Sequence, residues 1–255
     1  MMHFFEKILG LPVLASSNGR SVDQLIVYVH ILMVVLFVGW LAYFLFTLYR
    51  FNSKRNPKGD YLGVKNHASS YLEVAVAGIE AALLIFVAIP VWAHHVDEFP
   101  SESESTVVQV VAQQFLWNFR YPGKDGVFGE QDMHWVTATN PFGVDPSDPN
   151  GKDDIQTVNE MHVPVNKPVI VYVSSKDVIH SFRIIAMRVT QDAIPGMRIP
   201  VWFKPTKIGR YQINCAQLCG DGHAAMSNGY LTVESQADYQ KWLDSNTSAA
   251  SVSFE

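Results

Sequence analysis

Two long apolar segments dominate the first 93 residues of the chain. Residues 25–48 include no Asp, Glu, Lys or Arg, and residues 74–93 include a single acid, Glu80. A helix rises about 1.5 Å per residue, so either segment is long enough to cross a hydrocarbon core about 30 Å thick. The first segment is too long for the core of a cleaved signal peptide, and no small-residue cleavage site follows it. The pattern predicts a transmembrane helical hairpin over 25–93, with its loop at about 50–72.

Beyond residue 105, the apolar positions recur at the short spacing of β-strands. Runs rich in Val, Ile, Thr and aromatic residues alternate with clusters of Gly, Pro, Asn and Asp. Strands are expected over 106–121, 167–175, 181–189, 198–205, 209–215 and 229–235. The first is expected to be one long or bent strand, followed by an irregular, turn-rich excursion. Many short strands without a long helical period predict an all-β sandwich or barrel, ended by a short helix over 236–245.

These patterns divide the chain into five consecutive parts. The parts are an extracytoplasmic N-terminal lead (1–24), the hairpin (25–93), a polar linker (94–105), the β-domain (106–245) and a C-terminal tail (246–255). The expected fold class is therefore an N-terminal two-helix transmembrane hairpin followed by an all-β sandwich.

Basic residues set the expected orientation of the hairpin. The loop between the two apolar segments carries five of them: Arg50, Lys54, Arg55, Lys58 and Lys65. The lead carries only Lys7 and Arg20. Because basic loops stay on the cytoplasmic side, we expect the loop in the cytoplasm and both termini outside, which in a bacterium is the periplasm.

The segment outside the membrane is acidic. Residues 94–255 carry 19 acids and 12 bases, a net charge of −7. Such a surface repels the phosphates of nucleic acids and attracts basic proteins. We therefore expect no nucleic-acid binding, a basic protein partner, and membrane lipid around the hairpin.

Both cysteines of the chain lie in one short segment, CAQLCGDGHAAM at 215–226. Two cysteines outside the cytoplasm could form a disulfide. However, His223 and Met226 lie on the same turn-rich segment, and the glycines of GDGH allow its backbone to fold tightly around a centre. His180, in the turn DVIHSF between two other strands, could reach the same end of a sandwich. The segment therefore also suggests a metal site.

Ligand chemistry favours copper at such a site. Zinc rarely recruits Met, whereas thiolate, thioether and imidazole together suit copper. One Cys, two His and a weak Met would make a mononuclear blue-copper site. If both thiolates bridge two copper ions, each ion still needs an imidazole, from His180 or His223. Each also needs a weak ligand, from Met226 or the carbonyl of Gln217. This set leaves no residue over, which supports a two-copper electron-transfer centre.

Several features together resemble subunit II of cytochrome c oxidase. They are the hairpin, the acidic β-domain, and the motifs DVIHSF, DAIPG and C-x3-C-x3-H-x2-M, between about Leu25 and Leu243. The resemblance implies a cupredoxin fold that holds the binuclear copper centre CuA. The copper ligands that it implies are His180, Cys215, the carbonyl of Gln217, Cys219, His223 and Met226.

The resemblance also implies a role in respiration. Such a chain accepts electrons from cytochrome c, or from a dedicated donor complex that carries haem c. It passes them to haem a in oxidase subunit I, where haem a3 and CuB reduce dioxygen to water while protons are pumped. The implied location is the bacterial inner membrane, with both termini and the CuA domain in the periplasm. The sequence has no C-x-x-C-H motif, so we expect any haem c on another chain.

Two positions depart from the family pattern. Gln217 stands where the family carries a Glu that helps to bind magnesium at the contact with subunit I, and a neutral amide is a poor ligand for a hard cation. A magnesium site is therefore doubtful, although Asp192 matches the family motif near that contact. The alternative for Asp192 is a simple turn residue before Pro195. Phe115 stands where the family carries the tryptophan at which electrons from cytochrome c enter.

Other residues match the family but have simpler alternatives. Trp117 and Tyr121 match the aromatic run where electrons enter, yet they could be ordinary core residues of the sandwich. Glu73 matches an acid at the cytoplasmic mouth of a proton path, yet it could simply be a carboxylate near a helix N-terminus.

Two rival functions share some of these features. A quinol oxidase subunit would share the fold but lack the copper ligands, whereas all five ligand side chains are present here. A membrane-anchored copper carrier or chaperone, not part of an oxidase, would fit the cysteines and histidine but would not require Met226 or DVIHSF. Co-purification with haem would separate an oxidase subunit from a carrier.

Overall fold

A computed structural model describes residues 5, 7–59, 61–63 and 65–250. It divides into two compact units. The first unit holds the two long helices, and the second holds residues 12–20 together with the chain from His95 onward. Each unit is described by itself.

The first unit consists of two helices that are long and apolar enough to cross a membrane. Helix α2 spans Gly19–Arg50, and the second helix runs from Ala68 to Val96. The best 18-residue window of each has a mean hydropathy of 2.5, and almost none of either window is buried inside the protein. The two predicted apolar helices are therefore confirmed, and both extend beyond the apolar segments at both ends.

A proline shapes the second helix. The α-helix α3 (Ala68–Leu83) gives way to a π-helical turn η1 (Leu84–Ala88) before α4 (Ile89–Val96). Pro90 has no N–H, and its ring would collide with the carbonyl four residues earlier in a regular helix. The wider π-turn directly before it accommodates this ring without ending the helix.

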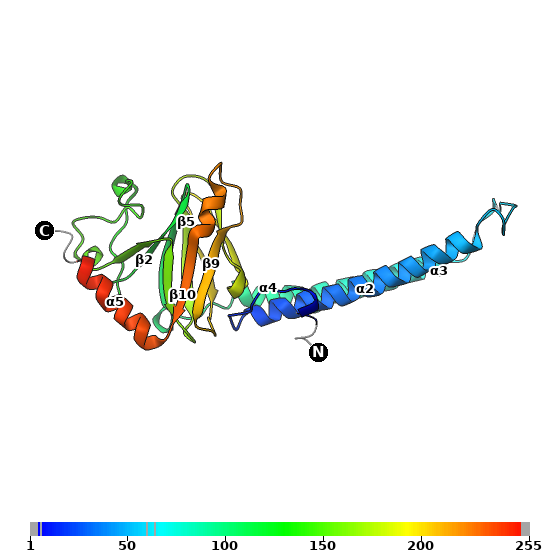
Figure 1. Cartoon of the computed structure of the whole chain (residues 1–255), viewed down its shortest axis with the longest axis horizontal. Helices are drawn as coiled ribbons and strands as arrows, with labels where there is room; N and C mark the ends of the chain where they lie inside the picture. The colour runs from blue at the N-terminus through cyan, green and yellow to red at the C-terminus, as the bar shows by residue number, and fades with distance from the viewer. Residues whose placement is uncertain (1–4, 6, 60, 64, 251–255) are drawn as a thin grey trace. The chain divides into compact units, whose positions relative to one another are not determined.

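The second unit is a sandwich of two five-stranded sheets (Figure 1). The first sheet has the order β3-β2-β1-β5-β8 and the second β4-β10-β9-β6-β7. The strands are β1 Thr106–Gln113, β2 Leu116–Tyr121, β3 Ile155–Val158, β4 Glu160–Pro164, β5 Val169–Ser175, β6 His180–Ile184, β7 Val189–Ala193, β8 Ile199–Phe203, β9 Gly209–Cys215 and β10 Gly229–Glu234. The β1–β5 and β4–β10 pairs are parallel, and the other pairs are antiparallel.

Between the sheets lies one apolar core. Strand β10 shows how the strands build this core. Buried and half-buried residues alternate along β10, because one face of the strand points inward. Trp117, Phe119, Phe182 and Leu231 are among the fully buried side chains. The predicted all-β sandwich is thereby confirmed.

Short helices complete the second unit. The 3-10 turns are η2 Glu102–Glu104, η3 Met133–Trp135, η4 Pro149–Lys152, η5 Ile185–Met187 and η6 His223–Asn228. The terminal helix α5 spans Gln236–Ala250, five residues beyond its predicted end.

Two of the predicted strands were wrong as single elements. Residues 106–121 form a hairpin, in which Gln113 pairs with Leu116 across a two-residue turn. That turn contains none of the Gly, Asn or Asp residues that normally signal one, so the sequence pattern missed it. Residues 181–189 are also split, because η5 ends β6 and Arg188 takes a left-handed conformation (φ 56°) before β7.

Two short strands were missed altogether. Strands β3 and β4 belong to different sheets, and the chain crosses between them at Asn159, which has a positive φ of 58°. Asn is one of the few side chains that tolerate this conformation. Its Oδ1 accepts a hydrogen bond from the Trp117 N–H (2.9 Å), and its own N–H donates to the Trp117 carbonyl (2.8 Å).

A buried ion pair fixes the excursion between β2 and β3. Arg120 is completely buried and donates to Asp154, to the Gly129 carbonyl (2.8 Å) and to Gln109 Oε1 (3.2 Å). Burial lowers the pKa of Arg120 and raises that of Asp154, and the direct hydrogen bonds between them oppose both shifts. Removing either partner of such a pair costs about 3–5 kcal/mol. The excursion is therefore held firmly at both of its ends.

Residues 12–20, which we call the N-terminal strap, are part of the sandwich unit. Ala15 is completely buried, and its N–H donates to the Ala186 carbonyl (2.8 Å) while its carbonyl accepts from the Thr206 N–H (2.8 Å). The Ser16 hydroxyl donates to the Met187 carbonyl (2.8 Å). The end of the predicted lead is thus built into the β-domain.

Candidate metal centre

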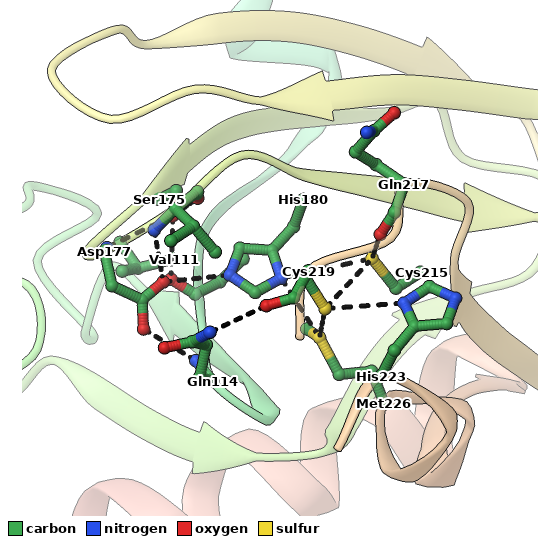
Figure 2. A network of polar contacts seen from close by, with 12 residues as sticks. Val111, Gln114, Ser175, Asp177, His180, Cys215, Gln217, Cys219, His223 and Met226 are labelled. Atoms are coloured by element: carbon green, nitrogen blue, oxygen red, sulfur yellow. Dashed lines mark hydrogen bonds and ion pairs between the residues drawn. The ribbon is translucent and has the colours of Figure 1, made fainter. Parts of the chain in front are cut away.

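Strand pairing brings the predicted ligands to one end of the sandwich. Cys215 ends β9 and pairs with Phe182 of the neighbouring strand β6, which begins at His180. After β9 the chain forms a loop and then η6, which carries His223 and Met226. All of these side chains meet in one cluster (Figure 2).

The two sulfur atoms are adjacent but not bonded. Cys215 Sγ and Cys219 Sγ lie 3.9 Å apart, and both are free thiols. A disulfide would need a separation of about 2.05 Å. Both side chains are buried. The structure therefore shows a pair of shielded thiols facing each other.

An imidazole lies beside each thiol. His180 Nδ1 is 3.9 Å from Cys215 Sγ, and His223 Nδ1 is 3.4 Å from Cys219 Sγ. The ligand atoms of His180, Cys215 and Cys219 all lie within 4.8 Å of one another, so one centre could be shared among them.

Two weak ligands complete the cluster. Met226 is fully buried, with its Sδ 3.1 Å from His180 Nδ1 and 3.5 Å from Cys219 Sγ. The carbonyl of Gln217 lies 2.9 Å from Cys215 Sγ. The structure thus brings together all six groups that the sequence predicts as copper ligands.

A carboxylate orients the His180 ring. Asp177 Oδ1 lies 2.9 Å from His180 Nε2 and also accepts from the Val178 N–H (2.7 Å). Burial by itself would raise the pKa of Asp177, but hydrogen bonds from the Gln114 N–H, His180 and the Val178 N–H bring it below its usual value. An ionised carboxylate only accepts hydrogen bonds, so it favours a proton on Nε2 and a lone pair on Nδ1, the nitrogen that faces the sulfurs.

The donor set fits copper rather than a hard cation. Thiolate, imidazole and thioether are soft or borderline ligands, and no carboxylate is among the six groups. Burial, and then the neighbouring Cys215, raise the pKa of the Cys219 thiol to about 11. Metal binding must therefore displace protons from the thiols.

Two glycines allow the ligand loop to pack tightly. Gly220 has a φ of +133°, which side chains rarely adopt. At Gly222, a Cβ would lie only 2.3 Å from the Phe115 ring. Phe115 is half-buried and occupies the space that the missing side chains leave, so the β1–β2 turn lies directly against this loop.

The other two aromatic candidates are buried in the core. Trp117 packs edge-on against His180, with ring centroids 6.3 Å apart, and its Nε1–H donates to the Met226 carbonyl (2.9 Å). Tyr121 packs against Trp242 and accepts a hydrogen bond from the His162 N–H (2.7 Å). Trp117 therefore touches the cluster, whereas Tyr121 is occupied with α5 and β4.

The other two candidates have exposed side chains. Asp192 is exposed on β7, where it pairs with Ser181 of β6. Glu73 is exposed on α3 in the other unit.

Sequence reasoning missed the roles of Asp177 and Gln114. Asp177 precedes His180 by three residues, a spacing that could have signalled the contact. Nothing comparable signals Gln114, whose side chain donates to the Cys219 carbonyl (2.7 Å) from a different sheet.

Known proteins have sequences similar to this one. Residues 106–233 match the family model "Cytochrome C oxidase subunit II, periplasmic domain". The alternative cytochrome c oxidase subunit 2 of Bradyrhizobium diazoefficiens is 30% identical over 99% of this chain and 89% of its own length. A probable cytochrome c oxidase subunit 2 of Rickettsia conorii is 29% identical over 85% of this chain, which spans 64% of that relative.

A solved structure is similar as well. The periplasmic domain of subunit II of cytochrome oxidase from Bradyrhizobium japonicum is 30% identical, covers 60% of this chain and 99% of its own, and has a TM-score of 0.44. The family model spans half of the chain, and the Bradyrhizobium diazoefficiens relative matches it almost end to end. The chain therefore belongs to the cytochrome c oxidase subunit II family, and its β-sandwich is the part that matches the family's periplasmic domain.

Proposed function

We propose that this chain receives single electrons at a two-copper centre and passes them to subunit I of its oxidase. The observation that carries the proposal is the pair of buried free thiols 3.9 Å apart, each with its own imidazole. Two copper ions held there would supply one-electron chemistry with the charge shared between the metals. Family membership supports a place in an oxidase with subunit I, which would carry haem a, haem a3 and CuB.

The protein's own groups would hold and shape this centre. The metals would be held by Cys215 and Cys219 through their sulfur atoms and by His180 and His223 through Nδ1, the nitrogen that faces a sulfur. The Met226 sulfur and the Gln217 carbonyl would be the weak ligands. The burial of the thiols would keep water and other thiols away from them.

The donor would be cytochrome c or a complex that carries haem c. We propose that electrons enter over Phe115, which is half-buried against the ligand loop, and pass through Trp117, which touches His180. Tyr121 would then support this route from within the core. The acidic outer segment favours a basic donor.

The remaining candidates concern the membrane and subunit I. We place the chain in a bacterial inner membrane, with the helix loop in the cytoplasm and the copper domain in the periplasm. Asp192 would lie near the contact with subunit I, Gln217 would not support magnesium binding, and Glu73 would lie at a proton path. Proton pumping would be a property of the whole complex.

Metal analysis of the purified oxidase tests the copper proposal. We expect three copper ions per oxidase, two on this chain and CuB on subunit I. We also expect co-purification with haem and an electron paramagnetic resonance (EPR) signal from one electron shared by two coppers. Cys215→Ser and Cys219→Ser should each abolish that signal, because serine replaces a soft thiolate with a hard, neutral hydroxyl that binds copper weakly.

Three results would count against it. Only two copper ions per oxidase, which leaves one for this chain once CuB is counted, would refute the paired centre. A disulfide between the two cysteines in the active protein would refute it as well. Copper without haem would favour a membrane-anchored copper carrier instead.

A further inference from the structure

The turn between β1 and β2 touches both halves of the candidate centre. Gln114 lies in this turn, and its main-chain N–H donates to Asp177 Oδ2 (2.7 Å). Its side-chain Nε2 donates to the carbonyl of Cys219 (2.7 Å). Figure 2 shows Gln114 between these two acceptors. One residue of the first sheet thus binds two segments that carry ligands.

The first bond acts on the histidine side of the centre. Asp177 uses its Oδ2 for Gln114 and its Oδ1 for His180 and the Val178 N–H, so both carboxylate oxygens are engaged. His180 is completely buried and presents Nδ1 to the sulfur atoms of Cys215 and Met226. The direction of the ring is therefore set by a carboxylate that the turn holds.

The second bond acts on the cysteine side. The Cys219 sulfur contacts His223 Nδ1 (3.4 Å), Met226 Sδ (3.5 Å) and Cys215 Sγ (3.9 Å), so the backbone position of Cys219 affects all three contacts. The loop that follows has a positive-φ glycine, Gly220, and no regular strand pairing of its own. The side-chain amide of Gln114 therefore forms a direct hydrogen bond to a loop that strand pairing does not stabilise.

We propose that Gln114 is a positioning residue, which sets the spacing between the His180 side and the Cys219 side of the centre. Its main-chain bond holds one side through Asp177, and its side-chain amide holds the other. The proposal rests on the proposed function, because its consequence is felt by the metal pair. Replacing a residue that supports metal ligands through hydrogen bonds typically changes metal affinity by about 10–100-fold.

The direct test is Gln114→Glu in the full-length chain within its oxidase. Glutamate keeps the size of the side chain and the main-chain N–H, but an ionised carboxylate cannot donate to the Cys219 carbonyl. Gln114 is exposed, so we expect the variant to fold. We expect a shifted reduction potential, altered copper hyperfine splitting in the EPR spectrum, and copper loss to a chelator at least about 10-fold faster.

Gln131→Glu is the matched control. Gln131 is also exposed, and its Nε2 also donates to a main-chain carbonyl, that of Phe142 (2.9 Å), within the excursion. The control adds the same charge and removes the same kind of hydrogen bond. Its potential, EPR spectrum and chelator resistance should match those of the wild type.

A metal-free readout separates this proposal from the copper proposal. In the full chain without metal, Cys219 should react with a maleimide about 10-fold faster in Gln114→Glu than in the wild type, because its loop opens more readily. Equal rates and equal potentials would overturn the positioning role. Equal changes in both glutamate variants would overturn it too, because charge alone would then explain them. A wild type without a two-copper signal would instead overturn the proposed function, and the maleimide rates would still decide the role of Gln114.

Discussion

Met226 is the candidate ligand best suited to test whether a residue is needed to bind copper or only to set its reduction potential. Its backbone is fixed independently, because the Met226 carbonyl accepts from Trp117 Nε1. Met226→Leu should therefore retain copper, cost less than about 1.5 kcal/mol of stability, and shift the reduction potential, since a thioether is lost at nearly constant volume. Spectroelectrochemistry of the purified oxidase measures the shift.

A control for this change exists in the same core. Met187 is equally buried but belongs to η5, so Met187→Leu makes the same substitution in another part of the core. Its potential should equal that of the wild type. An unchanged potential in Met226→Leu would remove Met226 from the ligand set.

The sequence predicted the candidate ligands of the centre, but not the residues that hold those ligands in place. Thiols, imidazoles and a thioether are recognisable by type and spacing, so the amino-acid sequence alone was enough to name the ligand candidates. Asp177 lies outside the predicted strands, and Gln114 lies within the strand predicted over 106–121, so neither residue was marked as part of the centre. Their roles depend on where two sheets place their loops, which local spacing does not encode.

Helix α5 begins with a capping arrangement that can be tested alone. The Asp238 N–H donates to Ser235 Oγ (3.1 Å), and the Ser235 hydroxyl donates back to Asp238 Oδ2 (2.7 Å). Ser235→Ala should cost about 1 kcal/mol, which is about a five-fold change in the opening of the helix. Hydrogen exchange at the backbone amides of residues 240–243 measures this opening.

The effect should depend on pH in a defined direction. The hydrogen bond from Ser235, followed by that from Lys241, holds the pKa of the Asp238 carboxyl below its usual value. A lowered pKa in the folded state stabilises the helix at neutral pH, and this contribution disappears as the pH falls through that carboxyl's pKa, below about 4. Ser245→Ala, at an exposed serine later in the helix, is the control and should leave the exchange nearly unchanged.

At the level of secondary-structure elements, the alternation of apolar and polar residues predicted the strands, but the sequence did not show where the chain turns between them. The strands that pack one face on the core, such as β5, β9 and β10, followed from their apolar spacing. The turn at Gln114 contains none of the usual turn residues. The crossing between the two sheets at Asn159 uses only one of them, the asparagine itself. Long-range pairing decides both, so the pattern of 106–121 looked continuous.

The orientation of the whole chain is testable with two added cysteines. Ser53 lies in the loop between the long helices and Ser147 lies in the excursion, and both are exposed. A maleimide that cannot cross the inner membrane should label Ser147→Cys in intact cells, but Ser53→Cys only after that membrane is disrupted. The opposite pattern would reverse the orientation that the basic loop predicts. The native thiols are buried and give little background.

The N-terminal strap has a consequence for biosynthesis. Ala15 emerges from the ribosome early, yet its backbone partners Ala186 and Thr206 are synthesised 171 and 191 residues later. Both partners must therefore reach the same side of the membrane, which requires an even number of crossings between them. The strap could then bind the β-domain only after both helices have been inserted. A chain in which the second crossing failed would expose the backbone groups and the apolar surface that the strap otherwise covers, and quality-control proteases could recognise them.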